Sequence, residues 1–97
     1  MAKGYIVAEL TITNPGPAFE EYRNSVLATM EPFGGRFLVR GGDPILLEGD
    51  HAASRVVILE FGSPEQAMAW YKSEQYQKIV PLRLNNALTR VLCAASV

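Results

Sequence analysis

The sequence predicts an α+β domain in which one four-stranded antiparallel sheet packs against helices. Three observations lead to this prediction. The hydrophobic pattern changes twice from strand-like to helix-like, clusters of Pro and Gly separate the segments, and the strand segments are apolar at consecutive positions. No linker or low-complexity tract interrupts residues 1–97, so we expect a single domain over that range.

The first two elements are a strand and an amphipathic helix. Residues 4–13 are rich in Tyr, Ile, Val, Leu and Thr, which favour strands, and the breaker cluster 14–17 ends them. Pro32 and Gly34-Gly35 are expected to end the helix that follows. Apolar residues on this helix recur three or four positions apart, which is typical of one helix face: Phe19, Tyr22, Val26, Met30 and Phe33.

The middle of the chain predicts two strands joined by a hairpin loop. Residues 36–40 and 55–61 have strand composition, and the small, polar residues 49–54 between them are expected to form the loop. Residues 45–48 are expected to continue the earlier strand beyond Gly41-Gly42, which predicts a bent strand.

A second helical region and a last strand complete the chain. Ser63-Pro64-Glu65-Gln66 has the residues of a capping box, with proline at the first helical position. A second helix start is expected at Ser73, and Pro81 is expected to kink or restart the helix before it ends at residues 85–86. Residues 88–95 are expected to form the last strand, in which Cys93 is expected to be a small buried thiol.

The order of the elements is β-α-β-β-α-β, the split arrangement of ferredoxin-like domains, in which both helices lie on one face of the sheet. Residues 5–8, 56–59 and 91–95 are nonetheless apolar at nearly every position, so both faces of the sheet should be covered. A second copy of the chain, packed sheet against sheet, would supply that cover. We therefore expect a homodimer in which two curved sheets form an α+β barrel.

Composition excludes several classes of partner. Nine Lys and Arg against 10 Asp and Glu give a net charge of −1, so no basic field favours nucleic acid or an anionic membrane surface. No apolar run approaches the roughly 20 residues of a membrane-spanning helix. A single cysteine fits a reducing compartment and predicts a cytoplasmic protein. The lone His51, expected in an exposed loop, does not make a metal site, and no metal or cofactor is expected.

Several segments together resemble a known family. They are Lys3-Gly-Tyr5, the block 34–42, Leu47-Glu-Gly49, 57–61 and 69–77. In this combination the chain resembles the domain of unknown function 1330 family, within the dimeric α+β barrel superfamily. The resemblance implies a ferredoxin-like subunit and a homodimer. Relatives similar only in fold include haem-degrading and cofactor-independent monooxygenases and muconolactone isomerases, so the resemblance implies no particular reaction.

One candidate site is a pair of arginines with a carboxylate. Alternation along a strand places Arg36 and Arg40 on one face, and a bulge at Gly41-Gly42 would bring Glu60 close to Arg40. These residues fit an anion clamp, with Glu60 as orienter or general base. The alternative is an ion pair at the rim of the dimer interface.

A second candidate site is a cleft between the second helical region and the sheet. Its apolar rings would hold a small hydrophobic or aromatic ligand, and hydroxyls with Arg83 would fix the polar end. The alternative for the rings is packing in the core. The candidate residues are Tyr5, Trp70, Tyr71, Tyr76 and Arg83.

Two hypotheses about function follow. In the first, the homodimer binds a small organic ligand, a carboxylate or an aromatic molecule, with cofactor-free oxygenase or isomerase chemistry carried by Arg40, Glu60 or Arg83. In the second, the protein is a dimeric binding or regulatory module without catalysis, and the same polar residues hold the interface together.

Overall fold

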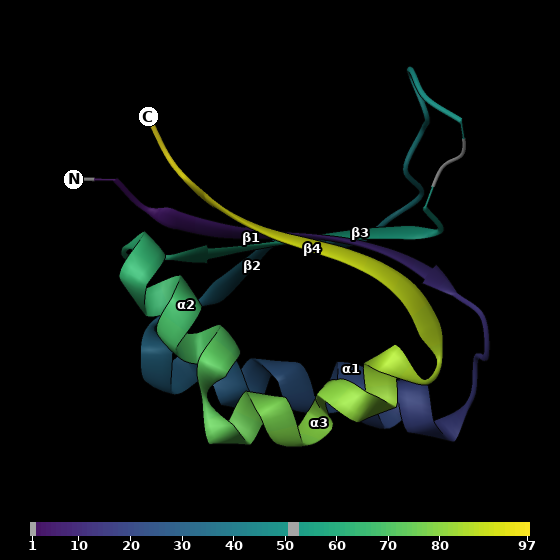
Figure 1. The fold of residues 1–97 in the computed structure, drawn as a ribbon, viewed down its shortest axis with the longest axis horizontal. Coiled ribbons are helices and arrows are strands. Elements are labelled where there is room, and N and C mark those ends of the chain that lie inside the picture. Colours follow the sequence, from purple (N-terminus) through teal and green to yellow (C-terminus); the bar gives the residue numbers. More distant parts are fainter. Residues whose placement is uncertain (1, 51–52) are drawn as a thin grey trace.

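The protein folds into two layers, a four-stranded sheet and a layer of helices (Figure 1). The computed structural model describes residues 2–50 and 53–97. In chain order the elements are β1 Gly4–Ile12, α1 Pro17–Met30, a 3-10 turn Glu31–Phe33, β2 Arg36–Gly41, β3 Arg55–Phe61, α2 Pro64–Lys72, α3 Glu74–Leu84 and β4 Ala87–Ala95.

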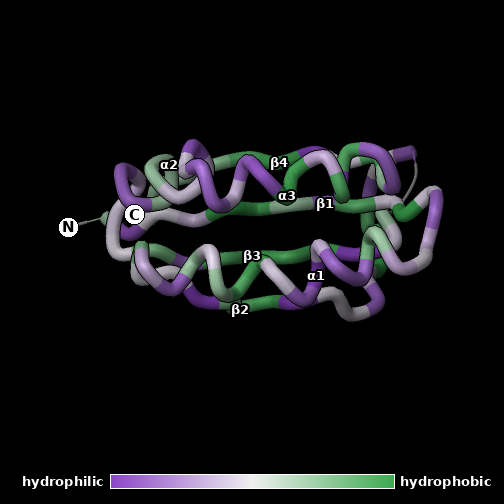
Figure 2. Tube along the Cα trace, turned by 90° about the horizontal axis from the view of Figure 1, so that it is seen from below, coloured by the Kyte–Doolittle hydropathy of each residue, from purple (hydrophilic) through white to green (hydrophobic). Residues whose placement is uncertain are grey.

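The sheet has the strand order β2-β3-β1-β4, and every pair of neighbouring strands is antiparallel. This arrangement confirms the predicted ferredoxin-like α+β fold. All three helices cover one face of the sheet (Figure 1). Viewed from the helix side, α1 crosses β2 and β3, while α2 and α3 cross β1 and β4 (Figure 2).

Two serines start the later helices as the sequence predicts. The Ser63 Oγ accepts a hydrogen bond of 3.1 Å from the Gln66 N–H at the start of α2, and the Ser73 Oγ accepts one of 3.3 Å from the Tyr76 N–H at the start of α3. The predicted restart at Pro81 is wrong, because α3 continues through this residue to Leu84. The Pro81 carbonyl accepts a hydrogen bond from the Asn85 N–H, so the last turn stays closed although proline removes one donor.

The segment between β2 and β3 departs from the prediction of a bent strand. Gly41 and Gly42 both have positive φ angles, 78° and 75°, which turn the chain out of the ladder after Gly41 pairs with Val56. The described residues 42–50 and 53–54 form no strand, and Ile45 and Leu47 are 83% and 89% exposed. This segment rises from the sheet on the side away from the helices (Figure 1).

The core lies between the sheet and the helices. Its largest fully buried side chains are Met30, Phe61 and Trp70, and the Trp70 indole N–H donates a hydrogen bond of 3.0 Å to the Thr29 hydroxyl. The Phe61 and Trp70 rings pack with their centroids 5.5 Å apart. Such rings supply most of the apolar area that a small domain can bury.

None of the helices formed by the described residues covers the opposite face of the sheet, here called the outer face (Figure 1). Strand alternation places Val7, Val56 and Ile58 on it, half-buried, and β4 adds the exposed Leu88 and Leu92.

Within residues 2–50 and 53–97, no helix combines the length and the apolar character that crossing a membrane requires.

Candidate functional site

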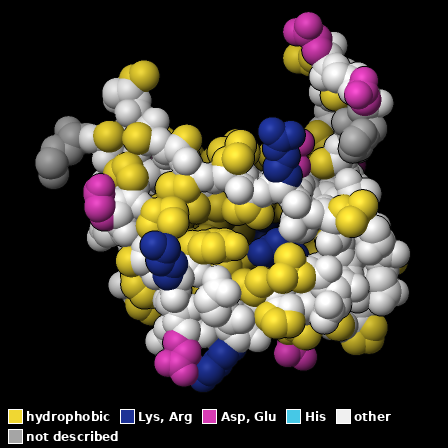
Figure 3. All heavy atoms as spheres, in the orientation of Figure 1, with side chains coloured by type: hydrophobic (Ala, Val, Ile, Leu, Met, Phe, Trp, Pro, Cys, Tyr) yellow, Lys and Arg dark blue, Asp and Glu magenta, His cyan; other side chains and the backbone are white. Residues whose placement is uncertain are grey.

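A cavity lies between the helix-facing side of the sheet and the helices. Figure 3 shows this side of the molecule hollowed below the sheet, with hydrophobic side chains inside and a Lys or Arg at one end of the hollow. The cavity has a volume of about 60 Å³. Strands and helices contribute the lining residues, among them Ile6, Leu10, Phe37, Leu59, Trp70 and Val91.

The cavity has a basic end and an apolar end. In the sheet, Thr89 pairs with Leu10 and Leu10 pairs with Arg55, so these three residues form one rung whose side chains face the helices. Four residues along β1, Ile6 pairs with Leu59 in an apolar rung. Arg55 belongs to the first rung and Arg83 is hydrogen-bonded to Thr89 in it. Ile6 and Leu59 of the second rung belong to the same core cluster as Trp70 and Phe61.

Arg83 is the most deeply buried charged group of the cavity. Its residue is 3% exposed, and its Nη1–H donates a hydrogen bond of 2.6 Å to the Thr89 hydroxyl. Its Nε–H is buried and has no hydrogen-bond partner in the described part of the chain. Burial lowers the pKa of Arg83, but the neighbouring oxygens of Tyr76 and Tyr22 raise it, and the net pKa lies above the ordinary value. The guanidinium therefore stays charged in a largely apolar site.

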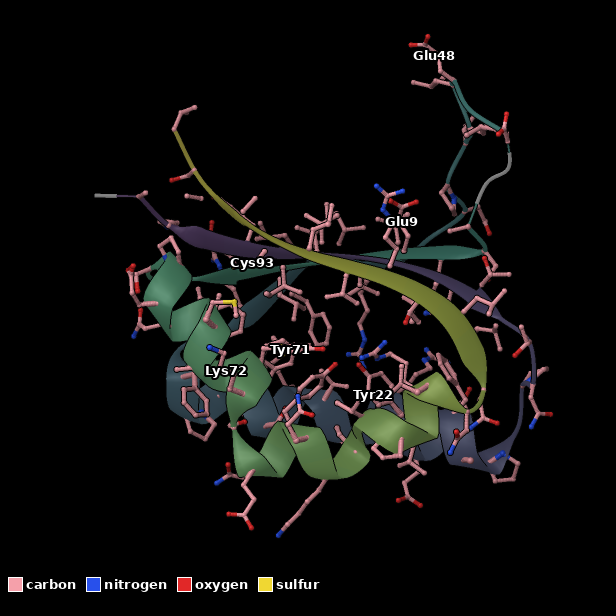
Figure 4. All side chains as sticks on the ribbon, in the orientation of Figure 1. Glu9, Tyr22, Glu48, Tyr71, Lys72 and Cys93 are labelled. Carbon is pink, nitrogen blue, oxygen red and sulfur yellow. The ribbon has the colours of Figure 1, made fainter. Side chains whose placement is uncertain are left out.

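Two tyrosines from different helices meet beside Arg83. The Tyr22 hydroxyl of α1 and the Tyr76 hydroxyl of α3 lie 2.7 Å apart and share a hydrogen bond. Figure 4 shows the Tyr22 side chain between the helices and the sheet. Burial and the neighbouring Tyr76 raise the pKa of Tyr22 well above its ordinary value. At neutral pH Tyr22 is therefore a neutral hydrogen-bonding group and not a base.

Further arginines surround the cavity at its edge. Arg40 places its guanidinium 4.3 Å from the Phe37 ring centroid and donates a hydrogen bond of 3.1 Å to the Arg23 carbonyl. Arg23 is already paired with Glu20 at 3.0 Å. Arg55 lies against the backbone of Gly41, where a Cβ would come within 2.5 Å of Nη2.

The described residues that line the cavity include several arginines but no carboxylate. They include Arg23, Arg40, Arg55 and Arg83, and none of them is Asp, Glu or His. Among residues 2–50 and 53–97 no cluster of three or more His, Cys, Asp and Glu side chains is placed to hold a metal ion. The lining offers cations, hydroxyls and apolar surface. Those groups can bind and orient an anion, but the described lining supplies no general base.

A second polar cluster lies on the outer face of the sheet. Glu60, 9% exposed, receives a hydrogen bond of 3.0 Å from the Tyr5 hydroxyl, and its carboxylate lies 2.7 Å from Arg36 Nη2 and 3.5 Å from Lys3 Nζ. The hydrogen bonds from Tyr5 and Arg36 hold the pKa of Glu60 below its ordinary value. The Glu60 carboxylate in turn raises the pKa of Tyr5.

The structure separates the residues that the sequence analysis had grouped into an arginine pair. Arg36 pairs with Glu60 on the outer face, whereas Arg40 pairs with Val57 and lines the cavity. The prediction that both arginines share a face is wrong because the register shifts between Phe37 and Val39. The bulge therefore lies between the two arginines, whereas it was expected after Arg40, at Gly41-Gly42. For the same reason Glu60 lies beside Arg36 and not beside Arg40.

The predicted aromatic cleft is present with a different membership. Trp70, Tyr76 and Arg83 line the cavity. Tyr5 does not, because it lies one residue before Ile6 and so points to the outer face. Tyr71 packs behind the lining, with its ring centroid 5.7 Å from that of Tyr76 (Figure 4).

Three polar lining residues were not among the predicted site residues, although the sequence pattern around two of them could have indicated their position. Tyr22 lies on the apolar face of the first helix, where it was taken only as core. Arg55 lies two residues before Val57 and four before Leu59, so alternation along β3 places all three on the helix-facing side. Arg23 follows Tyr22 with no pattern that marks it.

Cys93 is not among the described residues that line the cavity. Cys93 is exposed, and the expectation of a buried thiol is wrong because β4 is an edge strand. Its side chain lies on the helix side of the sheet near α2 (Figure 4). His51 lies outside the described residues.

Comparison with solved structures supports the fold. A protein of unknown function from Rhodopseudomonas palustris matches with a TM-score of 0.77 and 17% identity, covering 99% of this chain and 83% of that chain. SnoaB, a cofactor-independent oxygenase from Streptomyces nogalater, matches with a TM-score of 0.71 and 13% identity over 100% and 95% of the two chains. A dimeric ferredoxin-like protein of unknown function from Thermobifida fusca matches with a TM-score of 0.56 and 8% identity over 98% and 92%.

At these identities the solved structures share the fold with this chain and nothing more specific. No curated protein matches it. A sequence family does match, described as a domain of unknown function, DUF1330, and the match covers residues 3–97. Because that range includes nearly every residue, the chain belongs to the DUF1330 family.

Proposed function

We propose that the protein is a homodimer that binds a small organic molecule, a carboxylate or an aromatic compound, in the cavity between sheet and helices. The observation that carries this proposal is the buried Nε–H of Arg83, which has no hydrogen-bond partner among residues 2–50 and 53–97. A buried donor without a partner costs roughly 1–3 kcal/mol, and more when the group is charged. A ligand that accepts this hydrogen bond would remove the cost.

The cavity limits the size of such a ligand. Its 60 Å³ holds roughly four to six waters if each needs about 10–15 Å³ of such space. At about 30 Å³ of liquid volume per water, this corresponds to a molecule of roughly 120–180 Å³. A single ring with one or two small substituents has that size, and the apolar walls favour such a ring.

A cavity-filling variant tests the binding proposal. Ala8 lines the cavity, and the Ala8→Leu substitution would occupy it. We expect amide resonances around the cavity to shift when ¹⁵N-labelled protein is titrated with phenol, benzamide and benzoate, and we expect Ala8→Leu to abolish the shifts. Ala18→Leu, the same change at an exposed position of α1, is the control and should bind as the unmodified protein does. Absence of shifts with every compound, or equal shifts in Ala8→Leu, would overturn the proposal.

The lining favours binding over catalysis. Its described residues include no carboxylate or imidazole, and Tyr22 is neutral at physiological pH. Cofactor-independent oxygenase chemistry, as named for SnoaB, is the second candidate, favoured by the shared fold and by the paired Tyr22 and Tyr76 hydroxyls. Oxygen consumption by the protein with a bound phenol would favour this candidate. An unchanged phenol and no oxygen uptake leave a binding module.

The apolar side chains on the outer face of the sheet are the basis for proposing a homodimer. Val7, Val56 and Ile58 lie there without cover from the described part of the chain, and the Thermobifida fusca protein with this fold is described as dimeric. A second copy packed sheet against sheet would bury these side chains. We also expect the protein in the cytoplasm, because Cys93 is a free and exposed thiol.

A charged substitution on the outer face tests the dimer. We expect the unmodified protein to have the mass of two chains in light scattering, and Ile58→Glu to have the mass of one chain with unchanged circular dichroism. Leu84→Glu, at an exposed position of α3 on the helix side, should remain dimeric. A monomeric unmodified protein, or a dimeric Ile58→Glu variant, would contradict the proposal.

A further inference from the structure

The arginine end of the cavity defines the ligand more narrowly. We propose that the ligand is a single-ring aromatic monocarboxylate, with its carboxylate between Arg83 and Arg55 and its ring toward Trp70. This inference rests on the proposed function, because it names the chemical class that the same cavity takes.

The first step of the argument is the uncompensated charge of Arg83. Within the described residues, Arg83 forms no ion pair, although it is only 3% exposed and its Nη1–H is used by Thr89. A buried guanidinium without an anion loses its hydration without electrostatic compensation. A carboxylate in the cavity supplies the missing anion and accepts from the free Nε–H, and it does both more effectively than an amide or an alcohol.

The second step is the position of a second cation. Arg83 is tied to Thr89, and Thr89, Leu10 and Arg55 form one rung across β4, β1 and β3. Strands lie about 4.8 Å apart, so the backbones of Thr89 and Arg55 are separated by about 9.6 Å, with Leu10 between them. Arg83 and Arg55 thus approach the cavity from opposite sides of Leu10. A carboxylate that accepts from Arg83 therefore lies at the same end of the cavity as the charge of Arg55, which adds to its electrostatic stabilisation.

The third step is the orientation of the ring. Away from this rung the walls are apolar and aromatic: Ile6 and Leu59 come from the sheet, and Trp70 from α2. The Trp70 and Tyr76 rings pack at a centroid distance of 4.1 Å and form one end wall. A flat ring gains from aromatic faces, and the charged end stays next to the arginines.

The fourth step is the exclusion of larger and doubly charged ligands. Space for roughly four to six waters suits one ring better than a fused ring system. The aromatic end wall offers no cation for a second carboxylate, which would be desolvated there without a partner. The cavity therefore selects one acid group and one ring.

Isothermal titration with three matched probes tests the inference. Benzoate and benzamide have the same shape and differ in charge, and 2-naphthoate adds a second ring. We expect benzoate to bind at least ten-fold more tightly than benzamide and more tightly than 2-naphthoate. In Arg83→Gln and in Arg55→Gln the ratio of benzoate to benzamide affinity should fall toward one. Arg55 lies at the edge of the cavity, so its variant remains informative if Arg83→Gln fails to fold.

Arg90→Gln is the matched control. Arg90 follows Thr89 in β4 and points to the outer face, so this variant should keep the full preference for benzoate. Equal affinity for benzoate and benzamide, tighter binding of 2-naphthoate, or an unchanged preference in Arg55→Gln would overturn the inference and leave the proposed function standing. Failure of both single-ring probes to bind, or binding that persists in Ala8→Leu, would overturn the proposed function itself.

Discussion

Arg36 and Arg40 lie four residues apart in β2 and point to opposite faces of the sheet. Arg36 faces the outer side, where its Nη2 lies 2.7 Å from the Glu60 carboxylate, and Arg40 faces the cavity, where its guanidinium lies over Phe37. An even spacing along a regular strand would place both on one face. The register shift between Phe37 and Val39 reverses the alternation and places the two arginines on different faces of the sheet.

This separation makes the two arginines a matched pair for mutagenesis. Arg40→Gln removes a cation from the edge of the proposed site, so the affinity for benzoate should fall by about three- to ten-fold, or about 0.7–1.4 kcal/mol. Arg36→Gln should leave that affinity unchanged, since its side chain lies on the other face. Isothermal titration of both variants at equal ionic strength measures the difference. Equal losses of affinity in the two variants would contradict the assignment of faces.

The sequence predicts what depends on neighbouring residues and misses what depends on register. The caps at Ser63 and Ser73 are short-range features, and both helices start where the sequence places them. The faces of Arg36 and Arg40 depend on a one-residue shift near Leu38, and no local pattern marks that position. The same distinction holds for the candidate site residues. Arg83 is identified by its place among apolar residues, whereas the partner of Glu60 required the pairing of two strands.

The lowered pKa of Glu60 predicts a loss of stability in acid. Hydrogen bonds from Tyr5 and Arg36 favour the ionised carboxylate in the folded protein, so the folded pKa lies below the ordinary value of 4.5. The stabilisation is therefore complete above the pKa of the unfolded chain and is lost as the pH falls through the lowered pKa. Between about pH 6 and about pH 3, we expect the melting temperature of the unmodified protein to fall more than that of the Glu60→Gln variant.

Glu48→Gln is the control for this acid titration, because Glu48 is exposed in the segment between β2 and β3 (Figure 4). This variant should follow the unmodified protein through the same pH range. Melting curves of all three proteins, recorded at one protein concentration, give the comparison. Parallel curves for Glu60→Gln and the unmodified protein would show that the Glu60 cluster does not contribute to the pH dependence.

The shared hydrogen bond between Tyr22 and Tyr76 predicts non-additive substitutions. Each hydroxyl is the partner of the other at 2.7 Å, so Tyr22→Phe or Tyr76→Phe leaves one buried hydroxyl unpaired. Each single substitution should lower the free energy of unfolding by about 1–2 kcal/mol. The double substitution should cost less than the sum, with a coupling of about 1 kcal/mol. Urea unfolding of the four proteins measures the coupling, and strictly additive losses would show that the hydroxyls act independently.

Gly4 is required by the close approach of β1 to the start of α2. A Cβ at Gly4 would overlap the Ser63 carbonyl oxygen and lie 2.7 Å from the Pro64 Cα, and these backbone atoms are fixed by the capped helix. Gly4→Ala should therefore destabilise the protein by about 1–3 kcal/mol. Gly62→Ala is the control, because there the new Cβ meets the end of the flexible Gln66 side chain, and its effect should stay below about 1 kcal/mol. Urea midpoints at one protein concentration compare the two variants, and a Gly4→Ala protein as stable as Gly62→Ala would mean that strand and helix can separate without cost.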